Sequence, residues 1–259
     1  MIQFYLPEET VYHNDGREEK LLEFILSHPD YALMKGCPDR ILAAIDEYGR
    51  EKAFLMNVGT EKGQIVSKAI SRAKPKVIVE LGGYIGYSAL LFGDALRKAG
   101  GQKYISLEVS PIFASVSAAL IDLAGLNDII EIMVGPCRDS LRALSETYPG
   151  HSLDMFFFDH AKVEYTNDLK LCEELGLVSQ GTTVVADNVS RNPEYLEYVR
   201  ASGPKKRMAA DETKRLTLCH ESDMSLGRPD LRYETSVVHS IEPTGEPDAV
   251  DISYCLGSS

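Results

Sequence analysis

The chain has 259 residues, of which 44% are hydrophobic, and a formal net charge of −12 at pH 7. This length suits a single α/β domain with one sizeable core, and we expect residues 1–16 to be a loosely ordered polar start and residues 17–259 to form the domain. An acidic surface repels phosphate backbones, which argues against a nucleic-acid partner. No apolar run approaches the roughly 20 residues that span a bilayer, and no signal peptide is recognised, so no membrane association is predicted.

The cysteines indicate a reduced environment. There are five of them, an odd number, and no two have the CxxC spacing. Scattered thiols of this kind are typical of a cytoplasmic protein and argue against a zinc site.

The first part of the chain predicts helices. Apolar residues recur at helical spacing over 17–28, 38–54 and 61–73. Pro38 stands where the second of these would begin, a position that favours proline.

From Pro75 onward, predicted strands and helices alternate. The β runs are 76–81, 103–108, 129–134, 153–159 and 182–187, and the helical runs between and after them are 87–100, 111–125, 138–148, 167–176 and 193–202. Strands separated by helices predict right-handed crossovers and a doubly wound, mostly parallel sheet. The last two β runs, 233–241 and 249–256, have no helix between them, so we expect an antiparallel hairpin at the sheet edge and about seven strands in all.

Four acids close β runs: Glu80, Glu108, Asp159 and Asp187. Open α/β sheets bind ligands outside the carboxyl ends of their strands. This regular placement of carboxylates is the main functional signal of the sequence.

The segment after Glu80 predicts a nucleotide-like ligand. Gly82, Gly83 and Gly86 would form a tight turn that a ligand can approach closely. Their spacing departs from the GxGxxG pattern that binds a pyrophosphate, and the preceding acid favours a cationic or hydroxyl-rich ligand. Glu108 could accept hydrogen bonds from both ribose hydroxyls, or could simply be a solvated carboxylate. Together these features favour S-adenosylmethionine.

The later strand ends predict a metal. Asp159, Asp187 and Asn188 offer the hard oxygen ligands that Mg²⁺ prefers. Alternatively, Asp187 and Asn188 could cap the helix that begins near Pro193. A lysine beside a cation is pushed toward its neutral form, so Lys162 could take a proton from a diol hydroxyl, or it could be a solvated surface amine.

Several segments together resemble one family. The stretches ILAAIDEYGREKAFLMNVG, VELGGYIGYSALL, LDMFFFDHAK, GTTVVADNV and YLEYVR are similar to those of the catechol O-methyltransferases, over about residues 20–202. The resemblance implies a class I methyltransferase fold for the domain, transfer of a methyl group from S-adenosylmethionine to a catechol hydroxyl, and dependence on Mg²⁺.

The resemblance also implies residue roles. The cofactor would be bound by Met56, Val58, Glu80, Gly82, Tyr84, Ser88, Glu108, Cys137, Arg138, Asp159 and His160. Magnesium would be bound by Asp159, Asp187 and Asn188. Lys162 would be the general base, and the acceptor would contact Lys162 and Asn188. Glu242 is the nearest candidate for a family glutamate that contacts the second acceptor hydroxyl, or it could be a turn carboxylate before Pro243.

Two departures concern the acceptor. Phe54 and Ala161 stand where the family has tryptophans, and the chain has no tryptophan. A wider acceptor pocket is therefore expected, and an O-methyltransferase for another phenol or a natural-product diol stays open. An NAD-dependent oxidoreductase and a noncatalytic adenosyl-ligand binder are further, less favoured alternatives.

Overall fold

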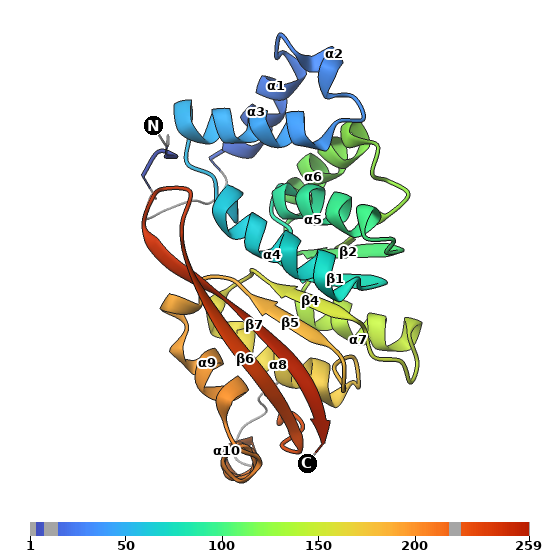
Figure 1. Cartoon of the computed structure of the whole chain (residues 1–259), viewed down its shortest axis with the longest axis vertical. Helices are drawn as coiled ribbons and strands as arrows, with labels where there is room; N and C mark the ends of the chain where they lie inside the picture. The colour runs from blue at the N-terminus through green and yellow to red at the C-terminus, as the bar shows by residue number, and fades with distance from the viewer. Residues whose placement is uncertain (1–3, 8–14, 218–223, 259) are drawn as a thin grey trace.

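The computed structural model describes residues 4–7, 15–217 and 224–258 (Figure 1). One seven-stranded sheet runs through the molecule in the order β3-β2-β1-β4-β5-β7-β6. The strands are β1 Val77–Leu81, β2 Lys103–Glu108, β3 Ile130–Val134, β4 Met155–Phe158, β5 Thr183–Ala186, β6 Leu231–Ile241 and β7 Pro247–Ser258. The α-helices are α1 Arg17–Leu26, α2 Tyr31–Met34, α3 Pro38–Glu51, α4 Gly59–Ala73, α5 Tyr87–Lys98, α6 Pro111–Ala124, α7 Cys137–Thr147, α8 Tyr165–Glu174, α9 Pro193–Arg200 and α10 Gly203–Thr217.

The sheet is buried on both faces because its strands are apolar on both sides. In β4, Phe157 packs into the core formed with α3 to α6, whereas Phe156 and Phe158 pack into the core formed with α7 to α9. All three phenylalanines are at most 1% exposed. The predicted doubly wound sheet is confirmed.

The strand order creates one switch point. The chain moves outward from β1 through β2 to β3, then returns to place β4 on the other side of β1 and continues to β5, all in parallel. The loops after β1 and β4 therefore diverge, and the gap outside their carboxyl ends is where such sheets bind ligands.

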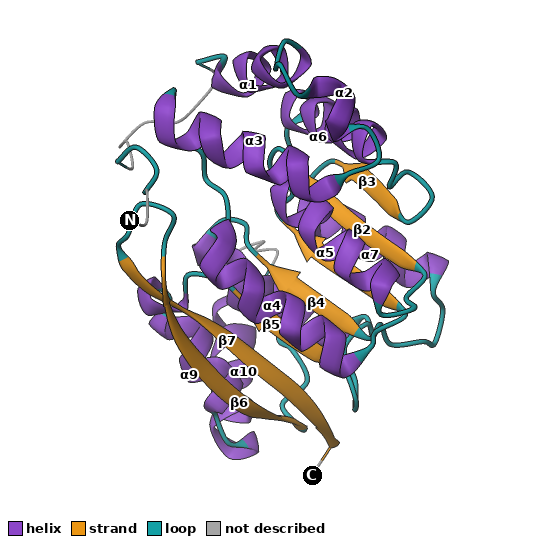
Figure 2. Cartoon of the chain, turned by 45° about the horizontal axis from the view of Figure 1, so that its top comes forward, coloured by secondary structure: helices purple, strands orange, loops and turns teal. Residues whose placement is uncertain are grey.

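The predicted hairpin closes the sheet. β7 pairs antiparallel with both β5 and β6, so the last strand of the chain lies between β5 and the edge strand β6. Figure 2 shows this long hairpin crossing the edge of the molecule, where β6 contacts α4 and α9. The hairpin turn thereby reaches the carboxyl end of β5.

Two helices were not predicted, the four-residue α2 and the longer α10. The α10 sequence GPKKRMAADETKRLT lacks an apolar stripe. It is anchored instead by Lys206, whose Nζ donates to Leu231 O at 3.1 Å and lies 4.2 Å from the ring centroid of Tyr198. A buried lysine on a tyrosine face is a tertiary contact that periodicity does not reveal.

The start of the chain touches the domain. Tyr5 is 7% exposed, and its hydroxyl donates to Asp46 at 2.5 Å. Residues 8–14 lie outside the described part, so the division at residue 16 stays a prediction. Within the described ranges, no helix is long and apolar enough to cross a membrane.

The turn after β1 requires glycine at position 82. Gly82 has φ +94°, and a Cβ there would lie 2.5 Å from Asp159 O and 2.9 Å from His160 Cα. We expect Gly82→Ala to lower the free energy of unfolding by about 2–5 kcal/mol, since it adds a backbone clash to conformational strain. Gly100→Ala is the control, because Gly100 has φ +81° with nothing within 4 Å, so only about 1–2 kcal/mol should be lost. Equal losses in urea unfolding would contradict this account.

Candidate active site

A cavity of about 540 Å³ opens at the carboxyl ends of the parallel strands, a size that suits a small-molecule ligand. It brings together most of the predicted site residues. Its lining includes Met56, Val58, Gly82, Tyr84, Ser88, Glu108, Cys137, Asp159, His160, Lys162, Asp187, Asn188 and Glu242. Phe54 and Ala161 line it as well.

Glu80 and Arg138 are not among the residues that line the cavity. Glu80 is fully buried and accepts a hydrogen bond from the Ser106 hydroxyl at 2.6 Å, while its Oε1 has no hydrogen-bond partner among the described residues. Burial raises its pKa to about 7. Arg138 donates to Asp168 Oδ1 at 3.2 Å and to Ser225 Oγ at 3.0 Å. Both predicted residues thus stand behind the cavity wall.

The glycine turn and Glu108 form one rigid unit. Gly82 N and Gly83 N both donate to Leu107 O, at 2.9 and 3.1 Å. Tyr84, with the unusual φ of 44°, donates its N–H to Glu108 Oε2 at 2.7 Å. Ser110 N donates to Glu108 Oε1 at the same distance. Two backbone donors therefore fix the carboxylate at the cavity wall, although burial raises its pKa.

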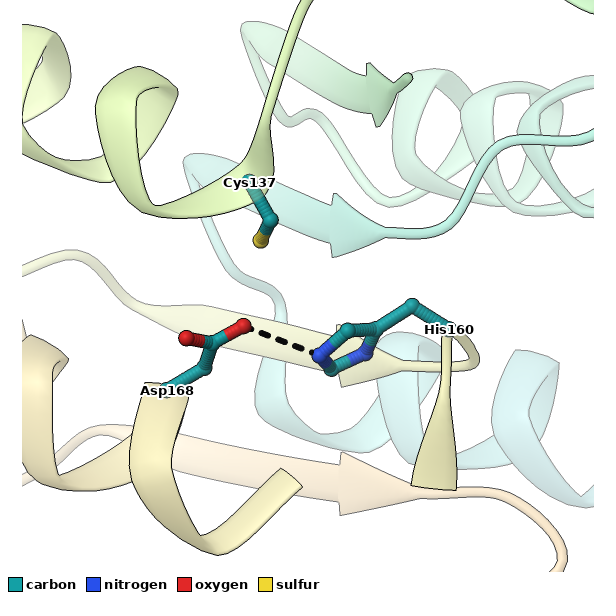
Figure 3. Close-up of side chains that lie close together, drawn as sticks. All are labelled: Cys137, His160 and Asp168. Carbon is teal, nitrogen blue, oxygen red and sulfur yellow. Dashed lines mark hydrogen bonds and ion pairs between the residues drawn. The ribbon is translucent and has the colours of Figure 1, made fainter. Parts of the chain in front are cut away.

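The side chains of Cys137, His160 and Asp168 lie close together (Figure 3), and the first two line the cavity. His160 Nε2 lies 3.0 Å from Asp168 Oδ2, and the imidazole stacks on Tyr165 with ring centroids 4.9 Å apart. Burial and the nearby Asp168 raise the pKa of the Cys137 thiol, which keeps it protonated. Since Asp168 already binds both Arg138 and His160, we interpret the cluster as the support of this wall. Asp168 was not predicted.

The ends of β4 and β5 bring the predicted metal ligands together. Asp187 N donates to Phe158 O at 2.9 Å, which places the two strand ends side by side. The alternative in which Asp187 and Asn188 cap the next helix is wrong. That helix, α9, is capped by Asn192, whose side chain accepts from Tyr195 N at 3.2 Å.

A buried lysine joins this group unexpectedly. Lys62 of α4 is fully buried, and its Nζ lies 2.7 Å from Asp187 Oδ2, 3.0 Å from Glu242 Oε2 and 3.1 Å from Asp248 Oδ2. Charged residues on helices are usually solvated, so Lys62 was not predicted as a site residue. A signal existed, because Lys62 falls at helical spacing between the buried positions Gly59 and Val66.

The electrostatics of this end fit a divalent cation. Burial, together with the neighbouring Asp187, raises the pKa of Asp159 well above its usual value. Burial also raises the pKa of Asp187 and brings that of Glu242 to about 7. Within the described part of the chain, Asp187 Oδ1 is buried without a hydrogen-bond partner. Crowded carboxylates with an unsatisfied hard oxygen are the donor set that Mg²⁺ takes.

Lys162 lies at the start of the short 3-10 turn Lys162–Glu164 and is half-buried. Its carbonyl oxygen accepts a hydrogen bond from Asn192 Nδ2 at 2.8 Å, which ties the loop after β4 to the loop after β5. Lys162 lines the cavity, and its amine is close enough to lower the pKa of Asp159. Burial raises that pKa by more. The two loops thus hold a lysine and the carboxylates of Asp159 and Asp187, the predicted metal ligands, around one cavity.

A class I methyltransferase is the kind of protein that this sheet order and cavity define. Residues 40–216 match the family model described as O-methyltransferase, and the chain belongs to that family. It is 36% identical over 198 residues to the catechol O-methyltransferase of Bos taurus, covering 76% of this chain and 71% of the relative. The corresponding enzyme of Mus musculus is 38% identical over 198 residues, covering 76% and 72%.

A solved structure agrees with the fold. The O-methyltransferase TomG from Streptomyces achromogenes, solved in complex with SAM, superposes with a TM-score of 0.58 at 19% identity, covering 96% of this chain and 93% of that chain. The predicted family and S-adenosylmethionine-dependent O-methyl transfer are confirmed, and the oxidoreductase and noncatalytic alternatives are set aside.

The buried Glu80 predicts a pH dependence of stability. Its folded pKa of about 7 lies above the ordinary value of 4.5, so between these pH values the folded protein keeps a proton that the unfolded chain has lost. The free energy of unfolding of the wild type therefore falls as pH rises from about 4.5 to 7. Glu80→Gln removes this titration, so between pH 4.5 and 8 the free energy of unfolding of the variant should rise by about 3 kcal/mol relative to that of the wild type.

Urea unfolding at several pH values, with a metal chelator present, measures this gain. Glu131→Gln serves as the control, because Glu131 is an exposed residue of β3. A wild-type-to-variant difference that stays constant with pH would show that Glu80 is ionised in the folded protein.

Proposed function

We propose that this protein is a magnesium-dependent catechol O-methyltransferase. The observation that carries the proposal is the meeting of Asp159, Asp187, Asn188 and Lys162 on the wall of one cavity that also contains Glu108 and the glycine turn. The kinship to catechol O-methyltransferases over most of the chain supports the acceptor class.

The cofactor would lie along the glycine turn. The fixed carboxylate of Glu108 would accept hydrogen bonds from the ribose hydroxyls. Met56, Val58, Gly82, Tyr84 and Ser88 would surround the methionine part, and Cys137 and His160 the adenine. Glu80 would act through the turn in front of it, and Arg138 through Asp168, which it holds in place.

Magnesium would be held by Asp159, Asp187 and Asn188. When bound, the ion would orient the two acceptor hydroxyls and make one of them more acidic. Lys162 would take the proton of that hydroxyl. The acceptor oxygen would then attack the methyl carbon, forming an O–CH₃ bond as the S–CH₃ bond breaks, and S-adenosylhomocysteine would leave. Alignment of oxygen, methyl carbon and sulfur supplies much of the rate.

Glu242 borders the cavity beside Asn188 and would face the second acceptor hydroxyl. Its two oxygens already engage Lys62 and Asn188, so its carboxylate is held in one orientation. This interaction supports the predicted acceptor role of Glu242.

The acceptor could also be another phenol or a natural-product diol. Ala161 is exposed at the cavity, and Phe54 is smaller than an indole. Both leave room beside the reacting group for a bulkier ring system than a simple catechol. A cytoplasmic location, suggested by the scattered thiols, stays a prediction.

The role of Lys162 can be tested by Lys162→Met, which keeps much of the bulk but cannot accept a proton. We expect kcat for a catechol to fall roughly 10²–10⁴-fold, the usual cost of losing a general base. The Kd of S-adenosylmethionine should stay within about twofold, since Glu108 is untouched. Lys98→Met, at an exposed residue of α5, is the matched control. Retention of full activity by Lys162→Met would refute the assignment.

Magnesium dependence can be tested by methyl transfer in excess chelator and after addition of Mg²⁺. We expect activity only with the ion, and Asp187→Ala should lose Mg²⁺ binding in calorimetry because a ligand is missing. Undiminished transfer under chelation would contradict the proposal, whatever the acceptor.

The wider pocket can be tested by Ala161→Trp. A restored indole would add apolar contact to a small catechol, so its KM should fall, while activity on a bulky catechol should decline. Kinetics with both acceptors separate this result from a general loss of activity. No effect on either acceptor would show that residue 161 does not face the acceptor.

A further inference from the structure

Lys62 and Asp248 contact the metal end of the site without belonging to it. Neither is among the residues that line the cavity, and neither side chain is exposed. Lys62 nevertheless contacts Asp187 and Glu242, and Asp248 contacts Asn188, all of which line the cavity. The pair therefore forms a layer directly behind the proposed metal ligands.

The hydrogen bonds of Lys62 account for its full donor capacity. An ammonium group has three N–H donors, and Lys62 has three carboxylate neighbours within 3.1 Å. These come from separate parts of the fold: Asp187 follows β5, Glu242 follows β6, and Asp248 belongs to β7. One side chain of α4 thus fixes the distances between three strand ends.

The same layer orients the amide of Asn188. Its Nδ2 donates to Asp248 Oδ2 at 2.8 Å and to Glu242 Oε1. Both amide hydrogens are therefore used behind the wall, and the amide oxygen is left as the atom available to a cation. Likewise, Asp187 Oδ2 accepts a hydrogen bond from Lys62, whereas no described residue donates to its Oδ1.

We propose that Lys62 and Asp248 are positioning residues that set the metal-ligand oxygens of Asp187 and Asn188. The inference rests on the proposed magnesium site and adds the residues that build it. Partners behind metal ligands typically contribute 10–100-fold to metal affinity by fixing ligand orientation.

If Lys62 acted only as a counter-charge, its removal would change the Mg²⁺ affinity in the opposite direction. If Lys62 only neutralised the carboxylates, removing its positive charge would strengthen binding of a divalent cation by Coulomb's law. If Lys62 orients the ligands, removing it weakens binding. The direction of the change in Mg²⁺ affinity therefore separates the two roles.

Asp248 offers the cleanest variants, because it touches neither the cavity nor, in this proposal, the ion. Asp248→Leu removes the acceptor of both Lys62 and Asn188, so the Kd for Mg²⁺ in calorimetry should rise 10–100-fold. Asp248→Asn is the matched control. It removes the charge but keeps an oxygen where both donors bind, and it should change the Kd by less than about threefold.

Lys62→Met tests the sign directly, and Lys68→Met is its control on the exposed side of the same helix. We expect a 10–100-fold weaker Mg²⁺ affinity for Lys62→Met and no change for Lys68→Met. The Kd of S-adenosylmethionine, measured without Mg²⁺, should stay within about twofold for every folded variant. Circular dichroism establishes folding, and the Asp248 pair decides the question should Lys62→Met not fold.

The outcomes are distinct. A wild-type protein that binds no Mg²⁺ overturns the proposed function, and this inference with it. A wild-type protein that binds Mg²⁺, combined with unchanged affinity in Asp248→Leu or tighter binding in Lys62→Met, overturns this inference alone.

Discussion

Burying several like charges together costs free energy, and the arrangement of charges at the carboxyl ends of the parallel strands offsets that cost. Asp187, Glu242 and Asp248 converge where the strands end, and a single buried ammonium group, that of Lys62, touches all of them. Removing one partner of such a group leaves an uncompensated charge in the interior. This interaction joins α4, the loop after β5 and the terminal hairpin at one point.

The second constraint is the switch point of the sheet. Because β1 neighbours both β2 and β4, its glycine turn can lie against Leu107 on one side and Asp159 on the other. Glu108 and Asp159 thereby border one cavity although they end strands on opposite sides of β1. The strand order alone therefore makes the proposed cofactor and metal regions adjacent, whatever the side-chain conformations.

Much of the fold and of the cavity lining was predictable from the sequence. Strand-end acids and glycine turns are local patterns, and a parallel sheet brings the carboxyl ends of its strands together. Lys62, Asp168 and Asp248 were not predictable in this way. Each lies in a helix or a hairpin strand and acquires its role only when distant segments pack. Glu80 showed the reverse case, since its position at a strand end suggested a cavity wall, whereas its side chain turned inward to Ser106. A local pattern predicts where a residue lies along a strand, whereas packing decides whether its side chain faces the cavity or the protein interior.

The strand order also has a consequence for synthesis. β7 ends at Ser258 and is hydrogen-bonded between β5 and β6, so the carboxyl-terminal segment fills an inner place of the sheet. Domains tend to form while the chain leaves the ribosome, amino-terminal parts first. Until β7 emerges, β5 keeps an unpaired edge and Lys62 lacks Asp248. A nascent chain can therefore pair β1 to β5 early, whereas Lys62, Glu242 and Asp248 come together only once β7 has paired with β5 and β6.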